Sequence, residues 1–354
     1  MNLYHYFMAF FTSFGVVLLA TPSLIKVAKL KHLVDEPKED RKQHTQSVPT
    51  IGGIMIFSAF MFSCFIWFPD SENMQEGISK FLYLMGSLVL LFFVGVKDDI
   101  IGMSPTKKLV AHILVGFILV AMGGMKIETF HGLFSVDVEL PEYAKLVISI
   151  FVYIVIVNSI NLIDGVDGLA SGVGIIASIT FGIWFYYSYQ PQWALVSFSL
   201  AGALLGFLVF NFNPARIFMG DSGSLTIGAI LSVLTIQLIE TPTTFLKPPF
   251  EFISTPVLAI GILTYPLIDT LRVFITRIFA GKSPMAADRN HLHHRLQDRG
   301  MGHKRVVFVI YLFSASCVAL VSFLPIKDPT LSFLALGAFV LLFIGFVTLP
   351  KRKV

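Results

Sequence analysis

Apolar runs long enough to cross a lipid bilayer set the strongest limit on how this chain can fold. A helix rises about 1.5 Å per residue, so about 18 apolar residues or more are read as a membrane span. Only 14% of the 354 residues are charged, against roughly 25% in soluble domains. We therefore predict an all-α integral membrane protein, a polytopic bundle of about 11 transmembrane helices. The eleven runs are residues 3–27, 52–68, 79–96, 107–125, 142–160, 171–188, 192–211, 222–240, 254–277, 305–325 and 330–350.

Basic residues are divided unequally between the two sets of loops that eleven spans create. Of the 26 Lys and Arg residues, 21 fall in the odd-numbered loops, their flanks and the C-terminal tail. Because positively charged loops stay in the cytoplasm, we predict the N-terminus outside and the odd loops and C-terminus inside. No repeat or linker interrupts the chain, so residues 1–354 are treated as a single transmembrane domain.

The second odd loop brings paired acids close to paired bases. Asp98 and Asp99 follow an apolar run directly and precede Lys107 and Lys108 by a few residues. Adjacent carboxylates repel each other and are costly to bury at a membrane interface unless a cation or metal compensates them. A solvated turn without a role is the alternative, but ionisable residues inside the membrane are read as functional by default.

The third odd loop is rich in amides, carboxylates and glycines. Asn158 and Asn161 stand three residues apart at the end of an apolar run, so they would share a helix face. Asp164 and Asp167 each precede a glycine, and Asn and Asp oxygens are hard ligands suited to Mg²⁺. A structural Asp-Gly turn remains open as the alternative.

Asp221 stands in the fourth odd loop, before small residues and another apolar run, and Arg216 precedes it in the same loop. This position is near a helix N-terminus, whose free N–H groups favour anions. A metal-bridged diphosphate would suit it, while a plain N-cap aspartate is the alternative.

Three histidines fall within four residues of the fifth odd loop: His291, His293 and His294, followed by Arg295. Zn²⁺ is one interpretation, but no cysteine and no Glu-x-x-His partner lies near them in the sequence. Histidine and arginine contacts to a phosphate are favoured instead. Lys42 lies in the basic segment of the first odd loop. Such a segment more often binds anionic lipid than a substrate.

The ninth apolar run contains both charges and prolines. Asp269 and Arg272 are three residues apart and can pair on one helix face. Pro256 and Pro266 predict kinks or breaks in the same run.

Five segments, in this order along the chain, resemble the motifs of a known family: residues 49–53, 94–99, 161–169, 218–224 and 291–295. Together they resemble the polyprenyl-phosphate N-acetylhexosamine-1-phosphate transferases, a glycosyltransferase family 4 group of the WecA and TagO type that is related to MraY. The interrupted pattern His-Leu-His-His is similar to that of the WecA and TagO branch, whereas MraY-type enzymes carry a continuous run of histidines.

The resemblance implies a multi-pass enzyme of the bacterial cytoplasmic membrane that begins lipid-linked cell-envelope glycans, such as cell wall or lipopolysaccharide. It would move N-acetylhexosamine-1-phosphate, most often that of N-acetylglucosamine, from a UDP-sugar to undecaprenyl phosphate and release UMP. It also implies Mg²⁺, with Mn²⁺ as a substitute, held by Asp221 and Asn161 at the inner face. Lys108 would contact a phosphate, and the histidine loop the diphosphate and sugar.

The expected mechanism is direct attack of the lipid phosphate, which is already largely dianionic at neutral pH. Asp98 would orient the phosphate or accept its residual proton, and Asp99 would hold Asp98 or the metal. The candidate residues are, for catalysis, Asp98, Asp99, Asp164 and Asp167; for substrate binding, Lys42, Lys108, Asn158, Arg216, His291, His293, His294 and Arg295; and for metal, Asp221 and Asn161.

Two other functions are alternatives: a phospho-MurNAc-pentapeptide transferase of the MraY type, and a membrane transporter of an anionic solute. A transporter places its site near the midplane between repeats, whereas here the charges cluster at one face. The expected partners are the UDP-sugar, the polyprenyl phosphate and the bilayer, with no nucleic acid, and a homodimer is left open.

Overall fold

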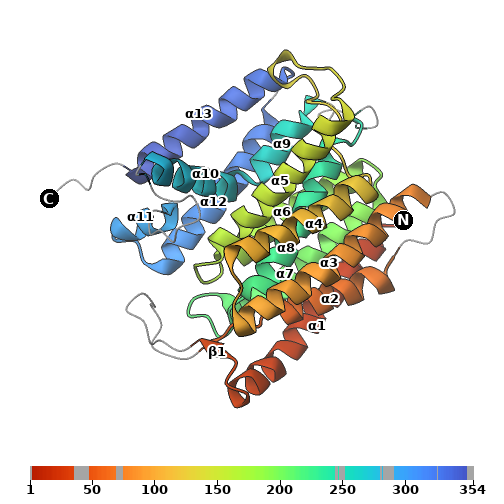
Figure 1. Ribbon diagram of the computed structural model, residues 1–354. Helices are drawn as coiled ribbons and strands as arrows, with labels where there is room; N and C mark the ends of the chain where they lie inside the picture. Colours follow the sequence, from red (N-terminus) through yellow and green to blue (C-terminus); the bar gives the residue numbers. More distant parts are fainter. Residues whose placement is uncertain are drawn as a thin grey trace.

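The computed structural model describes residues 2–35, 48–68, 75–243, 246, 252–279, 281, 291–324 and 326–348. Over these residues the protein is an assembly of helices (Figure 1). Its only strands in these ranges, β1 (Val34–Asp35) and β2 (Val48–Pro49), form a two-stranded antiparallel ribbon, so the predicted all-α class is confirmed. The helices are α1 (Leu3–Leu30), α2 (Gly53–Ile66), α3 (Gln75–Ile101), α4 (Pro105–Phe117) with its π-helical extension η1 (Ile118–Met122), the 3₁₀ turn η2 (Leu133–Ser135), α5 (Glu142–Ile163), α6 (Leu169–Tyr187), α7 (Pro191–Asn211), α8 (Gly220–Ile239), α9 (Thr255–Ile262), α10 (Thr264–Phe279), α11 (Leu292–Asp298), α12 (His303–Phe323) and α13 (Pro329–Thr348).

Every predicted apolar run coincides with helix in the described part of the chain. Among the residues that the structure describes, nine helices are long and apolar enough to cross a membrane, or ten if the bent pair α9 and α10 is one span. The ninth run forms the pair α9 and α10, and the second forms α2, which is shorter at 14 residues. Helices satisfy their own backbone polar groups, as a lipid environment requires. The predicted multi-spanning membrane fold is confirmed.

Helix α8 is the most enclosed of the spans. Its 18-residue apolar window is 100% buried, whereas that of α13 is 17% buried. It packs against α2, α3, α5 and α6. Small residues permit the close approach, since a Cβ on Gly228 would lie only 2.8 Å from the Cα of Val157 in α5. The position of the first residues of α8 is therefore set by several neighbouring helices at once.

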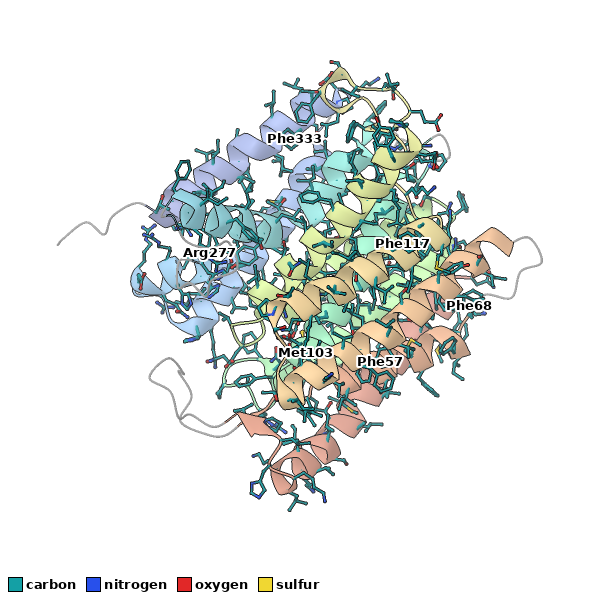
Figure 2. All side chains as sticks on the ribbon, in the orientation of Figure 1. Phe57, Phe68, Met103, Phe117, Arg277 and Phe333 are labelled. Carbon is teal, nitrogen blue, oxygen red and sulfur yellow. The ribbon has the colours of Figure 1, made fainter. Side chains whose placement is uncertain are left out.

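Large apolar side chains project from the outside of the bundle (Figure 2). Phe93 of α3, Phe117 of α4 and Leu342 of α13 are 65%, 47% and 74% exposed. A surface of this kind is a liability in water but is solvated by lipid tails. The outer surface therefore fits a bilayer.

The ninth run is broken, as its prolines predicted. Helices α9 and α10 meet at an angle of 74° around Leu263. Pro256 and Pro266 each stand in the first turn of one of the two helices, where a missing N–H costs no helical hydrogen bond. The second half of this span, α10, therefore leaves the direction of α9 and carries Asp269 toward α11.

Successive loops contact one another at two separate ends of the bundle. At one end, residues 98–108, 161–168 and 211–222 are joined by hydrogen bonds and an ion pair. At the other, His131 pairs with Glu240, and the N–H of Phe134 donates to the hydroxyl of Thr330. This separation matches the division into odd and even loops.

Candidate active site

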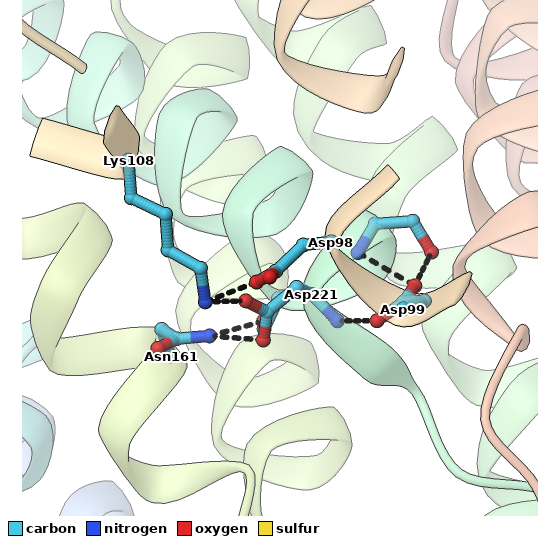
Figure 3. A network of polar contacts seen from close by, with 7 residues as sticks. Asp98, Asp99, Lys108, Asn161 and Asp221 are labelled. Atoms are coloured by element: carbon cyan, nitrogen blue, oxygen red, sulfur yellow. Dashed lines mark hydrogen bonds and ion pairs between the residues drawn. The ribbon is translucent and has the colours of Figure 1, made fainter. Parts of the chain in front are cut away.

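A lysine between two aspartates forms the centre of the candidate site (Figure 3). Asp98 lies in the last turn of α3, Lys108 in the first turn of α4 and Asp221 in the first turn of α8. The Lys108 ammonium pairs with both carboxylates. We call these three residues the ion-pair cluster. The positive partner predicted for the paired aspartates is thus Lys108, and the cluster joins three helices.

Asp99 is adjacent to Asp98 but has different partners. Its Oδ1 accepts the backbone N–H of Asp221 at 2.6 Å. Its Oδ2 accepts the N–H and the hydroxyl of Ser222, at 3.1 and 2.6 Å. The first N–H groups of a helix have no partner within it, and negative charge is favoured there. Asp99 therefore caps α8 from α3; its predicted catalytic role stays a prediction.

Two glycines let the first turn of α8 approach its neighbours. A Cβ on Gly95 of α3 would lie 2.5 Å from the Cα of Ser222. A Cβ on Gly53 of α2 would lie 2.1 Å from the backbone nitrogen of Gly223. Both distances are far below van der Waals contact, and both involve backbone atoms. A side chain at either position would push the start of α8 away from α2 or α3.

Residues 49–53, the first of the family-like motifs, pair with the chain just before α8. The N–H of Gly52 donates to the carbonyl of Phe218 at 3.0 Å. Gly220 then adopts a φ of +72°, and a Cβ there would lie 2.1 Å from the carbonyl oxygen of Thr50. Only glycine fits this left-handed position against the backbone. The segment thereby holds the loop that leads into Asp221.

Asn161 reaches the cluster from the last turn of α5. Its Nδ2 donates to Oδ1 of Asp221 and to the hydroxyl of Ser224, both at 2.9 Å. The amide thus turns its nitrogen toward Asp221, so the pair does not present two oxygens to one ion. A metal role for Asn161 requires the amide to rotate, since only its oxygen can ligate, and it stays a prediction.

Asp164 adds another carboxylate at the end of α5, where it is partly buried. Burial, with the charges of Asp221 and Asp99, raises the pKa of Asp164 well above its usual range. Together with Asp98, these make four carboxyl groups at the site, and the three besides Asp164 outnumber the ammonium of Lys108. A divalent cation would offset the excess negative charge, and carboxylate oxygens are ligands that Mg²⁺ prefers. The donor set therefore fits the expected metal.

Asp167 and Asn211 fasten the third and fourth odd loops to each other. Oδ2 of Asp167 accepts the side-chain amide of Asn213 at 2.9 Å and the N–H of Ala215 at 3.1 Å. The buried Asn211 accepts the N–H of Gly168 at 3.1 Å. Both side chains position loops around the ion-pair cluster, and a catalytic role for Asp167 stays a prediction.

Three residues predicted to bind substrate have no described contact with the ion-pair cluster. Arg216 is exposed and lines a pocket of about 300 Å³ with Lys26 and Lys29. Asn158 donates its amide to the backbone carbonyl one turn earlier in α5, at 2.8 Å. Lys42 lies outside the described residues. Their substrate contacts stay predictions.

The histidines form a separate cluster around Asp269, which is fully buried. Nδ1 of His291 lies 2.7 Å from Oδ2 of Asp269. The rings of His291 and His293 stack with centroids 5.3 Å apart, and His294 lies 4.2 Å from His293. Arg295 is exposed on the short helix α11, which also carries His293 and His294. We call Asp269, His291, His293 and His294 the histidine cluster.

The two clusters share no hydrogen bond or ion pair among the residues that the structure describes. The sequence predicted that five connections converge in one pocket. Direct contacts join four of them, and the fifth, with the histidines, forms its own group. Burial lowers the pKa of His293 to about 3, so this ring is neutral at pH 7.

Sequence reasoning missed two partners. Both oxygens of Asp269 bond to the chain near His291, a partner that the sequence did not predict; its pairing with Arg272 stays a prediction. The sequence does indicate that Asp269 needs a partner, because a carboxylate in an apolar run must be paired or hydrogen-bonded. It does not indicate which residue that partner is. The sequence marks Ser222 only as a small residue, although its hydroxyl and N–H both donate to Asp99.

The stretch that contains the ion-pair cluster matches a known protein family. A model of the family described as Glycosyl transferase family 4 matches residues 81–239. This stretch contains the whole ion-pair cluster, Asp99 and the third odd loop.

Similar proteins cover most of the chain. A Bacillus subtilis (strain 168) protein described as a probable undecaprenyl-phosphate N-acetylglucosaminyl 1-phosphate transferase is 30% identical over 318 residues, 89% of this chain and 84% of that protein. The decaprenyl-phosphate N-acetylglucosaminephosphotransferase of Mycolicibacterium smegmatis is 30% identical over 297 residues, 78% of this chain and 71% of that protein. The undecaprenyl-phosphate alpha-N-acetylglucosaminyl 1-phosphate transferase of Escherichia coli (strain K12) is 28% identical over 299 residues, 83% and 77%.

Proposed function

The chain belongs to glycosyl transferase family 4, among the polyprenyl-phosphate N-acetylglucosamine-1-phosphate transferases, and from this premise we propose its reaction and substrates. It transfers N-acetylglucosamine-1-phosphate from UDP-N-acetylglucosamine to undecaprenyl phosphate and releases UMP. The observation that carries the proposal is the ion-pair cluster, in which Lys108 pairs with Asp98 and Asp221 where α3 ends and α4 and α8 begin, at one face of a membrane protein.

Charge neutralisation is the main demand of this reaction. An oxygen of the lipid phosphate attacks the β-phosphorus of the donor, the bond to the bridging oxygen breaks, and UMP leaves with that oxygen. Phosphoryl transfer asks chiefly for positioning and electrostatic stabilisation. Lys108 supplies a mobile ammonium that can move from the carboxylates to phosphate oxygens as substrates bind. Asp98, on the other side of Lys108, orients the lipid phosphate or takes its residual proton.

Asp221, with Asp98 and Asp164 beside it, would hold Mg²⁺ at this site. When bound, Mg²⁺ neutralises the diphosphate and stabilises the leaving UMP. Asp99 keeps the first turn of α8 in place, so the carboxylate of Asp221 stays on the side of Lys108 and Asn161. The other residues predicted to bind substrate, including Arg216 and the three histidines, supply contacts to the UDP-sugar donor.

An apolar pocket of about 260 Å³ offers room for part of the lipid chain. It is lined by α5, α8, α9 and α10, with Phe151, Val155, Leu263 and Leu267 among its residues, and by residues 127–133, so it extends from mid-bundle toward the end opposite the ion-pair cluster. Almost all of its lining is hydrocarbon, as an isoprenoid requires. Beyond the bend, α10 packs against α5, the helix that also carries Asn161.

The active site faces the cytoplasm of a bacterial cell, because the loops at its end of the bundle carry most of the basic residues. Single cysteines test this orientation, since both natural cysteines, Cys64 and Cys317, are buried. Val138 is exposed at the opposite end, and Lys107 at the site end. A membrane-impermeant thiol reagent added to intact cells should label Val138→Cys but not Lys107→Cys; the reverse pattern rejects the orientation.

The reaction is tested with purified protein, UDP-N-acetylglucosamine and undecaprenyl phosphate. We expect UMP release and a lipid-linked sugar diphosphate only when both substrates and Mg²⁺ are present. Asp221→Ala should abolish turnover. A panel with UDP-N-acetylgalactosamine and UDP-MurNAc-pentapeptide identifies the donor, and turnover of the pentapeptide donor alone would replace the proposed sugar. Solute uptake into vesicles without any lipid product would point to a transporter.

A further inference from the structure

A carboxylate inside a membrane-spanning helix has both of its oxygens committed to the histidine loop. The side chain of Asp269, in the second turn of α10, is 0% exposed. Its Oδ2 lies 2.7 Å from Nδ1 of His291, and its Oδ1 accepts the N–H of Leu292, also at 2.7 Å. A buried carboxylate is costly unless it is fully bonded. These two contacts explain how Asp269 is tolerated, and they tie α10 to the start of α11.

The distances favour a hydrogen bond over a shared metal ion. Asp269, His291 and His293 place ligand atoms within 4.8 Å of one another, so a metal site must be considered. Two nitrogen or oxygen ligands on a tetrahedral Zn²⁺ stand about 3.3 Å apart when each is about 2.0 Å from the ion. Nδ1 of His291 and Oδ2 of Asp269 are only 2.7 Å apart. That is the separation of a charge-assisted N–H···O bond.

Asp269 fixes the start of a helix and the orientation of an imidazole together. Leu292 is the first residue of α11, and the preceding His291 makes no side-chain cap bond. The N–H of Leu292 would otherwise be a free helix donor, and Asp269 satisfies it. Because Nδ1 of His291 donates to the carboxylate, Nε2 is the ring atom left for a ligand.

The ring of His291 also orients the ring of His293, which lies beside it. His293 stacks on it at an interplanar angle of 12°, and is buried with an Nδ1 that has no partner among the described residues. Arg295 is exposed one turn further along α11. The cluster therefore places buried imidazole nitrogens within about one turn of the exposed Arg295, a chemistry that suits a phosphate and not an isoprenoid chain.

We propose that Asp269 is a positioning residue for the donor substrate: it holds His291 so that Nε2 contacts the diphosphate or sugar of the UDP-sugar. This inference rests on the proposed function for the identity of the donor. It separates the two substrates by location, because Leu267, two residues before Asp269 on the same helix, lines the apolar pocket assigned to the lipid. Helix α10 would then serve the lipid on one side and the donor through Asp269.

The test compares Asp269→Asn with His291→Gln in the full-length protein. Asparagine keeps the volume and the acceptor for Leu292, but its amide cannot accept from Nδ1 as the carboxylate does. We expect the KM for UDP-N-acetylglucosamine to rise about tenfold or more in each variant, with the KM for undecaprenyl phosphate unchanged. Asp298→Asn, an exposed aspartate at the end of α11, is the matched control and should stay within about twofold of the parent.

The double variant decides whether Asp269 acts through His291. If it does, Asp269→Asn should add less than about twofold to the effect of His291→Gln, because the second change has nothing left to orient. If the two single substitutions multiply their effects on the donor KM in the double variant, the proposal is overturned. It is also overturned if the donor KM of the single variants stays at the parent value. One equivalent of zinc in the purified parent, lost in Asp269→Asn, would show a metal site instead.

Two further measurements keep the outcome clear. Should Asp269→Asn not accumulate, His291→Gln alone still decides, because an unchanged donor KM in that variant overturns the proposal. Should the parent fail to use UDP-N-acetylglucosamine, the proposed function fails first. The variants are then compared by titration with UDP, which is common to every UDP-sugar donor, and equal UDP affinities in the parent and His291→Gln overturn the positioning role.

Discussion

Oδ1 of Asp99 lies 2.6 Å from the backbone nitrogen of Asp221, so one aspartate of the site holds the helix turn that presents the other. The neighbouring Asp98 instead shares Lys108 with Asp221. Two adjacent carboxylates thus perform different tasks. Asp99 accepts hydrogen bonds from backbone N–H groups of α8. Asp98 pairs with the ammonium of Lys108, which is expected to contact phosphate.

Asp99→Asn and Asp98→Asn should therefore differ in kind. Replacing Asp99 removes the negative charge at the start of α8, and we expect the free energy of unfolding to fall by about 1–2 kcal/mol. Replacing Asp98 leaves Lys108 paired with Asp221, so turnover should be lost with a smaller change in stability. Thermal unfolding in detergent, combined with UMP release, measures both. Equal losses of stability would contradict the capping role of Asp99.

Gly95→Ala tests whether the close approach of α3 and α8 is needed. The new methyl group would lie 2.5 Å from the Cα of Ser222, and overpacking of this kind costs about 1–3 kcal/mol. Turnover should fall as well, because the first turn of α8 must shift. Gly86→Ala in the same helix is the control, since a Cβ there meets nothing within 4 Å. A Gly95→Ala enzyme as stable and active as Gly86→Ala would show that the contact is dispensable.

The positions of the helices, and the end of the bundle at which each loop lies, were predictable. Both follow from the length and spacing of the apolar runs along the chain. An apolar run of sufficient length has few alternatives to a span, and alternating crossings sort the loops onto two faces. The ninth run was also predicted to break, because Pro256 and Pro266 cannot donate backbone hydrogen bonds. The direction and the 74° size of that bend depend on packing against α5 and α12, which the sequence does not state.

Individual partners within the site were not predictable, for a geometric reason. Asp98 and Asp99 are neighbours in sequence but point about 100° apart on a helix of 3.6 residues per turn. Which of them faces Lys108 depends on the rotation of α3 against α8, and that rotation is set by contacts such as Gly95 with Ser222. The same applies to Asp269, whose partner His291 is 22 residues away.

Lys108→Met should abolish turnover while the neighbouring lysine remains replaceable. Removing the ammonium leaves Asp98 and Asp221 facing each other without compensation, and removes the side chain expected to meet phosphate. We expect a loss of at least about a hundredfold in kcat/KM. Lys107→Met, at an exposed position one residue away, should keep near-parental rates. Similar losses in both variants would point to the net charge of the loop and not to the ion-pair cluster.

Removal of divalent cations should stop the reaction reversibly. The carboxylates of Asp98, Asp99 and Asp221 outnumber the ammonium of Lys108. This excess negative charge repels a diphosphate, and a bound cation offsets it. Treatment with EDTA should abolish UMP release, and excess Mg²⁺ should restore it, with Mn²⁺ as a substitute. Asp221→Ala should not recover at any Mg²⁺ concentration tested. Full activity of the parent in EDTA would contradict the predicted metal requirement.

Acidification should weaken the fold through His293. The pKa of this buried ring is lowered to about 3 in the folded protein, while an unfolded histidine titrates near about 6.5. Between these values the unfolded state binds more protons, so stability is lost as the pH falls below about 6.5, by up to about 1.4 kcal/mol per pH unit. His293→Gln should flatten the dependence of the unfolding midpoint between pH 7 and pH 5. His303→Gln, at a partly exposed position, should keep the parental slope. A slope that persists in His293→Gln would assign the acid sensitivity to other groups, and would mean that His293 is already protonated or reachable by water in the folded protein.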